Sequence, residues 1–479
     1  MFNSKTSGQI ITVFFLEANS AIAFSIFYAG LSIYLTNTLF MSKDISTSIT
    51  GMFLALNYFL PIIGGLLTTQ LITYKRLYIV GMFFSFIGCL ILAQEKLVFY
   101  GLSLILINSL VSKICLRMFI THLFEKEQVS ERRVAFLWSY IGMNVGFLIG
   151  FFLTGFFTNL NNYSLLFSTM SIFLIISALL CFLFIKPMEQ KLSWQTGKLS
   201  QLTMTMAILT GIALLITFLL LNAEIASHYL LLGLVTAFGG TLTYAIKNTP
   251  EGVKSSYWKF LAYWMLALVF WTAYMLTPTA IMQIIHNNTQ NIIFGVKIAP
   301  AWFINIDSIV ILILASQLAL RINKQKDQQQ KSVLSYYSRG FILSAVAFFI
   351  LYFGVTHSST KIPAIIMLGY LIFMSAAEVF ISPISSAIIG ELIPEKMQSL
   401  MTGICTINLG IGSLLAGYIA KHFILPNTQP AVVSAAHSFG LESTLISIAL
   451  LMTTLAFISW IFSYRVSKNV AYNNQNDNL

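Results

Sequence analysis

The feature that most constrains this chain is a series of long apolar stretches separated by short polar breaks. Fourteen such stretches lie between residues 9 and 466. A helix needs roughly 20 apolar residues to cross about 30 Å of hydrocarbon. With 57% hydrophobic and only 9% charged residues, a water-soluble fold would expose too much apolar surface. The sequence therefore predicts an all-α integral membrane protein with fourteen transmembrane helices, near residues 9–36, 46–73, 76–93, 98–122, 133–158, 164–185, 199–221, 228–246, 255–285, 300–320, 334–355, 362–392, 397–420 and 440–464.

The distribution of basic residues predicts the orientation of the chain. An even number of spans places both termini on one side of the membrane. Most of the 27 Lys and Arg residues then fall in loops on the same side as the N-terminus. Such an excess marks the cytoplasmic side. We therefore expect a multi-pass protein of the cell membrane (inner or plasma membrane) with both termini in the cytoplasm.

Long basic connections divide the predicted spans into groups. They lie at residues 186–198, 247–259 and 321–331. The first two leave six spans before them, two between them and six after them. We predict an N-terminal six-helix bundle over residues 1–186, an inserted two-helix hairpin over 187–254 and a C-terminal six-helix bundle over 255–479. Two six-span halves with a mid-membrane site between them are typical of the major facilitator fold.

Several functional classes find no support in the residues. The chain has no long polar segment that could fold as a catalytic or nucleic-acid-binding domain, and its net charge of +11 lies in the loops. We recognise no metal cluster, nucleophile–base pair or phosphate-binding loop. The four cysteines occur singly in apolar stretches, as packing residues do. We therefore expect no enzyme, catalytic residue, cofactor, metal or nucleic-acid partner.

Separated motifs occur in both predicted halves. The first half contains Tyr58-Phe-Leu-Pro-Ile-Ile-Gly-Gly-Leu-Leu, Tyr74-Lys75-Arg76, Lys113, Arg132-Arg133 and Tyr140-Ile-Gly-Met-Asn144-Val-Gly146. The second half contains Phe270-Trp271, Pro278-Thr279, Phe294-Gly295, Ile298-Ala-Pro-Ala-Trp302-Phe303 and Glu378-Val-Phe-Ile-Ser382-Pro383. In this order and spacing, the sequence resembles the proton-dependent oligopeptide transporter (POT) family of the major facilitator superfamily, including its bacterial form with two inserted helices. The resemblance implies a secondary active transporter that imports di- and tripeptides with protons.

Five charged residues lie well inside the apolar spans, away from the loops and span ends: Glu17, Lys113, Arg117, Asp307 and Glu378. A charge at mid-membrane costs ~2.5–3.5 kcal/mol, so each calls for a reason. A dipeptide zwitterion carries an ammonium and a carboxylate, and we expect Glu378 to bind the first and Lys113 the second. The resembled family assigns these roles to the corresponding residues. The alternatives are a buried ion pair or, for Arg117, a side chain that snorkels to the interface.

Other polar residues are candidates for the wall of the same site. We expect Tyr28, Tyr58 and Asn144 to meet the donors and acceptors of a peptide in a dry pocket. The resemblance places binding residues at Tyr58 and Asn144. The alternative is that these side chains pack the helices, as tyrosine commonly does in membrane spans.

The first span departs from the resembled family. The motif E-x-x-E-R-F falls on Glu17-Ala-Asn-Ser20-Ala21-Ile22, so the second acid and the arginine are missing. In the turn after the second span, the aspartate and arginine of the family are Thr69 and Gln70. The second half also differs, because Leu276 occupies the usual acidic or glutamine position before Pro278.

Two charges are unusual gains relative to the same family. Arg117 lies one helical turn after Lys113 and so on the same face, and Asp307 occupies a position that is normally asparagine. We hypothesise that Arg117 partly replaces the missing arginine. We further expect Glu17 and Asp307 to supply the titratable acid for proton coupling.

The leading prediction is a proton-coupled importer of short peptides that works by alternating access. A second possibility is a transporter or exporter of another small zwitterion or an organic anion. A third is a membrane receptor that keeps the fold and does not transport. The expected partners are a short peptide or similar zwitterion, the proton and membrane lipid, and a monomer is expected.

Overall fold

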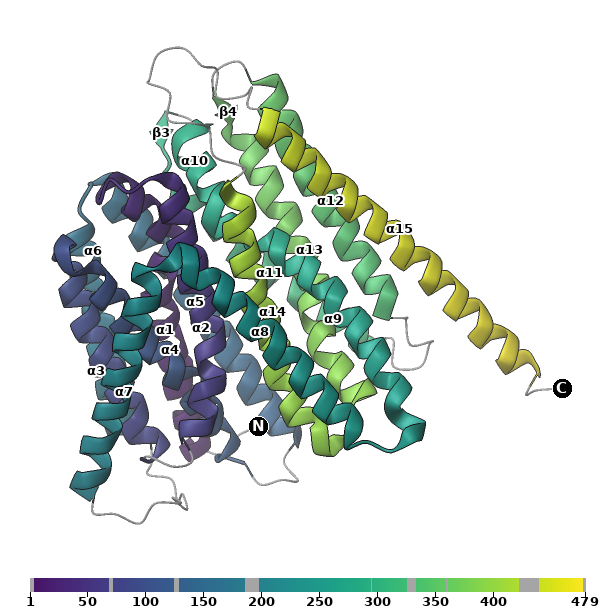
Figure 1. Cartoon of the computed structure of the whole chain (residues 1–479), viewed down its shortest axis with the longest axis horizontal. Helices are drawn as coiled ribbons and strands as arrows, with labels where there is room; N and C mark the ends of the chain where they lie inside the picture. Colours follow the sequence, from purple (N-terminus) through teal and green to yellow (C-terminus); the bar gives the residue numbers. More distant parts are fainter. Residues whose placement is uncertain are drawn as a thin grey trace. The chain divides into compact units, whose positions relative to one another are not determined.

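The computed structural model describes residues 4–68, 72–124, 129–185, 198–293, 295–324, 333–358, 361–421 and 439–476 (Figure 1). The chain divides into two compact units, unit 1 over Met1–Leu231 and unit 2 over Leu232–Leu479. The helices of unit 1 are α1 (Ser4–Asn37), α2 (Lys43–Thr68), α3 (Tyr74–Leu92), α4 (Val98–Thr121), α5 (Val129–Asn159), α6 (Tyr163–Phe184) and α7 (Lys198–Leu221), with a short η1 (Glu95–Leu97). Helix α8 (Ala223–Lys247) contains the boundary between the units.

Unit 2 contains the remaining elements. They are η2 (Glu251–Val253), α9 (Lys254–Tyr274), η3 (Thr277–Ile281), α10 (Met282–Asn288), α11 (Pro300–Lys324), α12 (Val333–His357), α13 (Ala364–Leu392), α14 (Glu395–Ala420) and α15 (Phe439–Asn476). Four strands of two residues each lie between the helices: β1 (Thr289–Gln290), β2 (Ile292–Ile293), β3 (Val296–Lys297) and β4 (Ile362–Pro363). Strand β1 pairs in parallel with β4, and β2 pairs antiparallel with β3.

Each of the fourteen predicted apolar stretches contains a helix, and the described residues that are not helical lie mainly at the span ends, such as 72–73 and 362–363. Twelve helices in these ranges are long and apolar enough to cross a membrane, and shorter apolar segments at Pro300–Leu314 and Ile407–Ala420 lie in α11 and α14. The prediction of an all-α membrane protein is confirmed. Residues 69–71, at the end of the second predicted span, and the predicted domain boundary at 186/187 lie outside the described residues. The three-part division of the chain stays a prediction.

The predicted span 255–285 is not one continuous helix. It consists of α9, a π-helical turn (η3) and α10. Pro278 lies in the turn and has no backbone N–H to donate. The hydrogen-bond pattern widens there, and Ile281 N donates to Leu276 O, five residues back, at 2.9 Å. The break leaves Tyr274 at the end of α9, and π-helical turns are frequent at functional sites.

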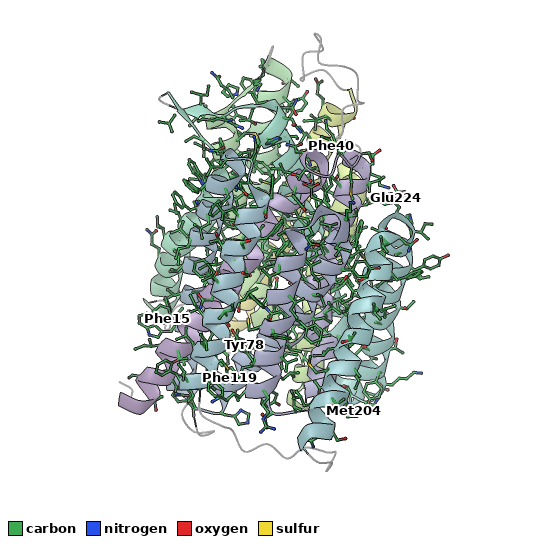
Figure 2. All side chains as sticks on the ribbon, turned by 90° about the vertical axis from the view of Figure 1, so that its left-hand side faces the viewer. Phe15, Phe40, Tyr78, Phe119, Met204 and Glu224 are labelled. Atoms are coloured by element: carbon green, nitrogen blue, oxygen red, sulfur yellow. The ribbon has the colours of Figure 1, made fainter. Side chains whose placement is uncertain are left out.

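Each unit has its own set of contacts between helices. In unit 1, α1 packs against α5 and α6, and α3 packs against α4 and α6. Helix α7 packs on α4, where Thr217 Oγ1 donates to Ser103 Oγ at 2.7 Å. In unit 2, α12 lies between α13 and α15, and α11 packs on α13 (Figure 1). Large apolar side chains such as Phe15 on α1 point outward (Figure 2), as expected of surfaces that face lipid.

Three glycines four residues apart bring α5 against α1. A Cβ atom built at Gly142 would lie 2.5 Å from Phe14 O, and one at Gly146 would lie 2.2 Å from Ala18 O. A Cβ at Gly150 would lie 1.9 Å from Ser25 Oγ. Small residues allow this approach of two backbones in membrane helices. The close contact aligns α5 with the part of α1 that contains Glu17.

Gly146→Ala is expected to destabilise unit 1. The added methyl group would collide with the backbone carbonyl of Ala18, which cannot rotate away, and such overpacking typically costs about 1–3 kcal/mol. Thermal unfolding of the purified protein in detergent measures the change. Gly211→Ala in α7 is the matched control, because nothing lies within 4 Å of its added Cβ. Equal melting temperatures for the two variants would contradict the close contact.

Candidate functional site

The cationic part of the candidate site lies on α4. Lys113 and Arg117 are one turn apart, and both side chains are exposed. The Lys113 Nζ lies 4.9 Å from the ring centroid of Tyr58 on α2 and 6.0 Å from that of Phe24 on α1. Aromatic faces attract a cation without neutralising its charge. Among the residues that the structure describes, the salt bridge found joins Lys254 to Glu251 in unit 2. Lys113 and Arg117 therefore form no ion pair with a described residue.

Glu17 on α1 is the acid of the same region. It is half-buried, and its Oε1 accepts a hydrogen bond from Ser139 Oγ on α5 at 2.9 Å. Glu17 is also close enough to Arg117 and Lys113 to interact electrostatically with both cations. Two cations and one acid leave an excess of one positive charge. This region of unit 1 is suited to bind an anionic group such as a carboxylate.

A polar contact precedes the two cations on α4. Ser109 lies one turn before Lys113, and its Oγ donates to Asn57 Oδ1 on α2 at 2.6 Å. The Asn57 Nδ2 is shut off from solvent and has no hydrogen-bond partner in the described part of the chain. Asn57 is the neighbour of Tyr58. Sequence reasoning did not single out Ser109 or Asn57, although their spacing from Lys113 and Tyr58 could have indicated them.

The three predicted wall residues have different surroundings. Tyr58 is half-buried beneath the Lys113 ammonium, as the site prediction requires. Tyr28 is buried, and its ring packs against Phe24 and Phe151, with centroids 6.3 and 6.1 Å apart. Asn144 is buried, and its Nδ2 donates to the Tyr140 carbonyl one turn earlier in α5. The structure therefore joins Tyr58 to Lys113 and gives Tyr28 and Asn144 contacts within the helix packing.

Uncharged hydroxyl groups occupy the part of α1 that departs from the family motif. The Tyr78 hydroxyl on α3 lies 2.9 Å from Ser177 Oγ on α6 and 3.4 Å from Ser20 Oγ. Tyr78 is fully buried, and its ring packs edge-on against Phe119 on α4 (Figure 2). Ala21 is buried as well. A network of neutral hydroxyl groups therefore stands where the family motif has charges, and such groups need no counter-charge.

The acidic part of the candidate site lies in unit 2. Tyr274, at the end of α9, donates its hydroxyl to Asp307 Oδ2 on α11 at 3.0 Å. The same hydroxyl also faces Glu378 on α13. Ser375, three residues before Glu378, lies with its Oγ 2.6 Å from Asp307 Oδ1. The contacts bring Asp307 and Glu378 to one hydroxyl group.

The two acids have no cationic neighbour in an ion pair. No salt bridge to Asp307 or Glu378 occurs among the residues that the structure describes. The Glu378 Oε2 is closed off from solvent and lacks a hydrogen-bond partner there. No group of three or more His, Cys, Asp or Glu side chains in the described ranges could hold a metal ion. This arrangement suits an ammonium group or a proton.

A profile of the POT family matches residues 68–435, which is more than half of the chain. This chain belongs to the POT family. The resemblance inferred from the motifs is thereby confirmed, and membership makes the chain a multi-pass membrane transporter and not an enzyme. The match covers both units, including Lys113 in the first and Asp307 and Glu378 in the second.

Several bacterial relatives share one name. Dipeptide and tripeptide permease A of Proteus mirabilis is 23% identical over 83% of this chain and 82% of its own length. The protein of that name in Escherichia coli is 23% identical over 88% of this chain and 87% of its own length. The chain is therefore similar to these permeases over almost their whole length.

Solved structures of POT transporters share the fold. One in complex with 5-aminolevulinic acid has a TM-score of 0.82 at 17% identity, and the match covers 95% of this chain and 96% of that one. Another, in complex with sulfate, has a TM-score of 0.82 at 16% identity and covers 96% and 95%. At these identities the likeness establishes the fold alone.

The structure brings together some predicted residues through others that the sequence did not reveal. Lys113, Tyr58, Arg117 and Glu17 lie in one region of unit 1, and Asp307 and Glu378 meet in unit 2. Ser139 and Tyr274 were missed, because each contacts its acid from a distant part of the sequence. Ser375 could have been found, because it is three residues from Glu378 and so on the same helix face.

Proposed function

We propose that this POT-family chain imports di- and tripeptides together with protons by alternating access. One observation carries the proposal: Lys113 and Glu378 lie in membrane spans of different units, and neither is in a salt bridge within the described residues. Each is therefore available to bind an oppositely charged ligand group. A peptide with free ends carries one of each. The names of the bacterial relatives, which are dipeptide and tripeptide permeases, support the same substrate class.

The residue roles follow the chemistry of each region. Lys113, assisted by Arg117, binds the peptide carboxylate, and Glu378 binds the ammonium. Tyr58 lies beside Lys113 and contributes a hydroxyl group, while Tyr28 and Asn144 shape the wall behind it. Glu17 and Asp307 are the acids proposed for proton coupling. The loss of an acid and a base together from α1 leaves neither of those two charges without its partner.

The cellular setting is part of the same proposal. We infer an inner or plasma membrane location with both termini in the cytoplasm, from the excess of basic residues in the loops on that side. The chain acts as a monomer surrounded by lipid. The inserted pair of helices over 187–254 separates six-helix bundles over 1–186 and 255–479.

A second candidate substrate is another small zwitterion. The neutral network of Ser20, Tyr78 and Ser177 replaces charges of the family motif, so the unit 1 region differs from that of a typical member. One structure with this fold holds 5-aminolevulinic acid, which is not a peptide. A transporter of this kind would take up amino-acid-like compounds in preference to peptides, and a receptor without transport would take up neither.

Uptake into proteoliposomes tests these alternatives. A panel of dipeptides, tripeptides and single amino acids is supplied with and without an inward proton gradient. One pH unit stores about 1.4 kcal/mol per proton, which supports up to roughly tenfold accumulation at one proton per peptide. We expect di- and tripeptides to accumulate only with the gradient. Gradient-independent flux would remove the symport proposal, and flux of amino acids alone would favour the second candidate.

A further inference from the structure

One tyrosine hydroxyl in unit 2 lies between two carboxyl groups. The Tyr274 hydroxyl is 3.0 Å from Asp307 Oδ2 and also faces Glu378. The three residues come from α9, α11 and α13, which pack against one another through α13. Among the titratable groups that act on the pair are Asp307, Glu378 and Tyr274 themselves. No salt bridge reaches the pair among the described residues.

With both acids ionised, the hydroxyl groups of this cluster have fewer hydrogen atoms to donate than there are oxygen atoms to accept them. A hydroxyl group has one hydrogen to donate, and an ionised carboxylate has none. Tyr274 faces two carboxyl groups with that one hydrogen. The Ser375 Oγ lies 2.6 Å from Asp307 Oδ1 and 2.8 Å from Leu371 O, again with one hydrogen for two acceptors. If both acids were ionised, the single Tyr274 hydrogen could point to only one of the two carboxylates. The contact between the Tyr274 oxygen and the other carboxylate would then have no hydrogen.

We propose that Asp307 and Glu378 share one bound proton through the Tyr274 hydroxyl and form the proton-holding site of unit 2. One added proton completes the contacts around Tyr274. It also removes the repulsion between two like charges in a site without a cation. Glu17 in unit 1 is a separate acid, which accepts a hydrogen bond from Ser139 and lies near two cations.

The shared proton can occupy either of two positions in this cluster. In the first, the proton is on Asp307 Oδ2 and is donated to the Tyr274 oxygen, while Tyr274 donates its own hydrogen to Glu378. In the second, the O–H bond at Asp307 has broken and one at the Tyr274 oxygen has formed. The former Tyr274 O–H bond has broken in turn, and its hydrogen is now bonded to Glu378. One proton has moved from Asp307 to Glu378, and the hydroxyl is restored.

The two arrangements differ in what Glu378 can bind. With the proton on Asp307, Glu378 is ionised, and its Oε2, which lacks a partner, can accept an ammonium hydrogen. With the proton on Glu378, the attraction for an ammonium group is lost. The cluster could then hold one proton and one ammonium at once, as a symporter must. This consequence rests on the proposed function, whereas the shared proton does not.

Infrared titration of the purified protein without peptide tests the shared proton. A protonated carboxyl group has a carbonyl stretching band that a carboxylate lacks. Two coupled acids titrate in separate macroscopic steps that belong to the pair. We expect the wild-type protein to keep a protonated-acid band at neutral pH that Asp307→Asn shifts or removes. Tyr274→Phe should shift the same band, because the hydroxyl that joins the two acids is gone.

Two control variants make the titration specific. Tyr370→Phe removes another buried hydroxyl of unit 2, which lies 3.2 Å from Thr277 Oγ1 and contacts no acid there. Glu224→Gln removes an exposed acid in the first turn of α8. Neither should change the band. The proposal is overturned if Asp307→Asn or Tyr274→Phe leaves the titration unchanged, or if Glu224→Gln removes the band.

Transport by the same variants separates this inference from the proposed function. We expect Asp307→Asn to retain exchange of labelled for unlabelled peptide, which needs no net proton movement, and to lose its gradient-driven accumulation. Full accumulation by Asp307→Asn would overturn the proton-holding role. Absence of any flux in the wild-type protein would instead contradict the proposed function, and the infrared titration would still decide whether the pair shares a proton.

Discussion

Glu378→Gln is expected to reduce the affinity for dipeptides with a free N-terminus by roughly 30-fold or more. Truncating one partner of a buried, charged hydrogen bond costs about 2–5 kcal/mol, and each 1.4 kcal/mol is tenfold in affinity. Glutamine keeps the shape of the side chain and removes its charge. Binding to purified protein measures the loss. Glu224→Gln, at an exposed acid in the first turn of α8 (Figure 2), should bind peptides as the wild-type protein does.

Chemical changes in the peptide identify the group that Glu378 contacts. N-acetylation removes the ammonium and should weaken binding to the wild-type protein to a similar extent. If Glu378 binds the ammonium, acetylation should cause little further loss in Glu378→Gln, because the interaction is already gone. Amidation of the peptide carboxylate should weaken peptide binding by the wild-type protein and by Glu378→Gln to the same extent. Fully additive losses for acetylation would contradict the assignment.

The membrane fold follows directly from the sequence. Each span is long enough to cross the hydrocarbon layer and too apolar to remain in water, so its existence depends on local composition alone. Lys113 and Glu378 could be singled out for a related reason, because charges are rare and costly in such spans. The break between α9 and α10 was not foreseen, although Pro278 was visible, because the continuous apolar stretch suggested one helix.

The partners of the charges depend on packing between distant helices. Ser139 bonds Glu17 across 122 residues, and the contact follows from the glycines that bring α5 against α1. Tyr274 reaches Asp307 and Glu378 because α9 ends near Pro278. Periodicity and composition carry no information on such contacts. The loss of charge at Ser20 was evident from the sequence, but its hydroxyl partner was not.

Substitution of the two acids in unit 2 and of the two cations in unit 1 should have different effects. In unit 2 the acids stabilise a proton, so removal of one changes the protonation of the other. In unit 1 the cations Lys113 and Arg117 repel each other and are balanced in part by Glu17. A bound carboxylate would supply the missing negative charge. The effect of a substitution at Lys113 should therefore depend on the charge of the ligand.

Lys113→Gln is expected to reduce the affinity for peptides with a free carboxylate by roughly 30-fold or more, for the same physical reason. Lys113 has the closer contacts, because its ammonium lies over the Tyr58 and Phe24 rings. Arg117→Gln should cost less, since the longer side chain lies one turn away and assists. Lys96→Gln, at an exposed lysine in η1, is the control and should leave affinity unchanged.

Amidated peptides decide whether Lys113 acts on the carboxylate. Amidation should weaken binding to the wild-type protein, and it should have little further effect in Lys113→Gln. N-acetylation should weaken peptide binding by Lys113→Gln as much as it weakens binding by the wild-type protein, because it removes the peptide ammonium, which is the group assigned to Glu378. Opposite selectivity in Lys113→Gln and Glu378→Gln would place the two ends of the peptide on different units of the chain. If amidation still weakened Lys113→Gln as strongly as the wild-type protein, Arg117 would be the main carboxylate ligand and the assignment to Lys113 would be wrong.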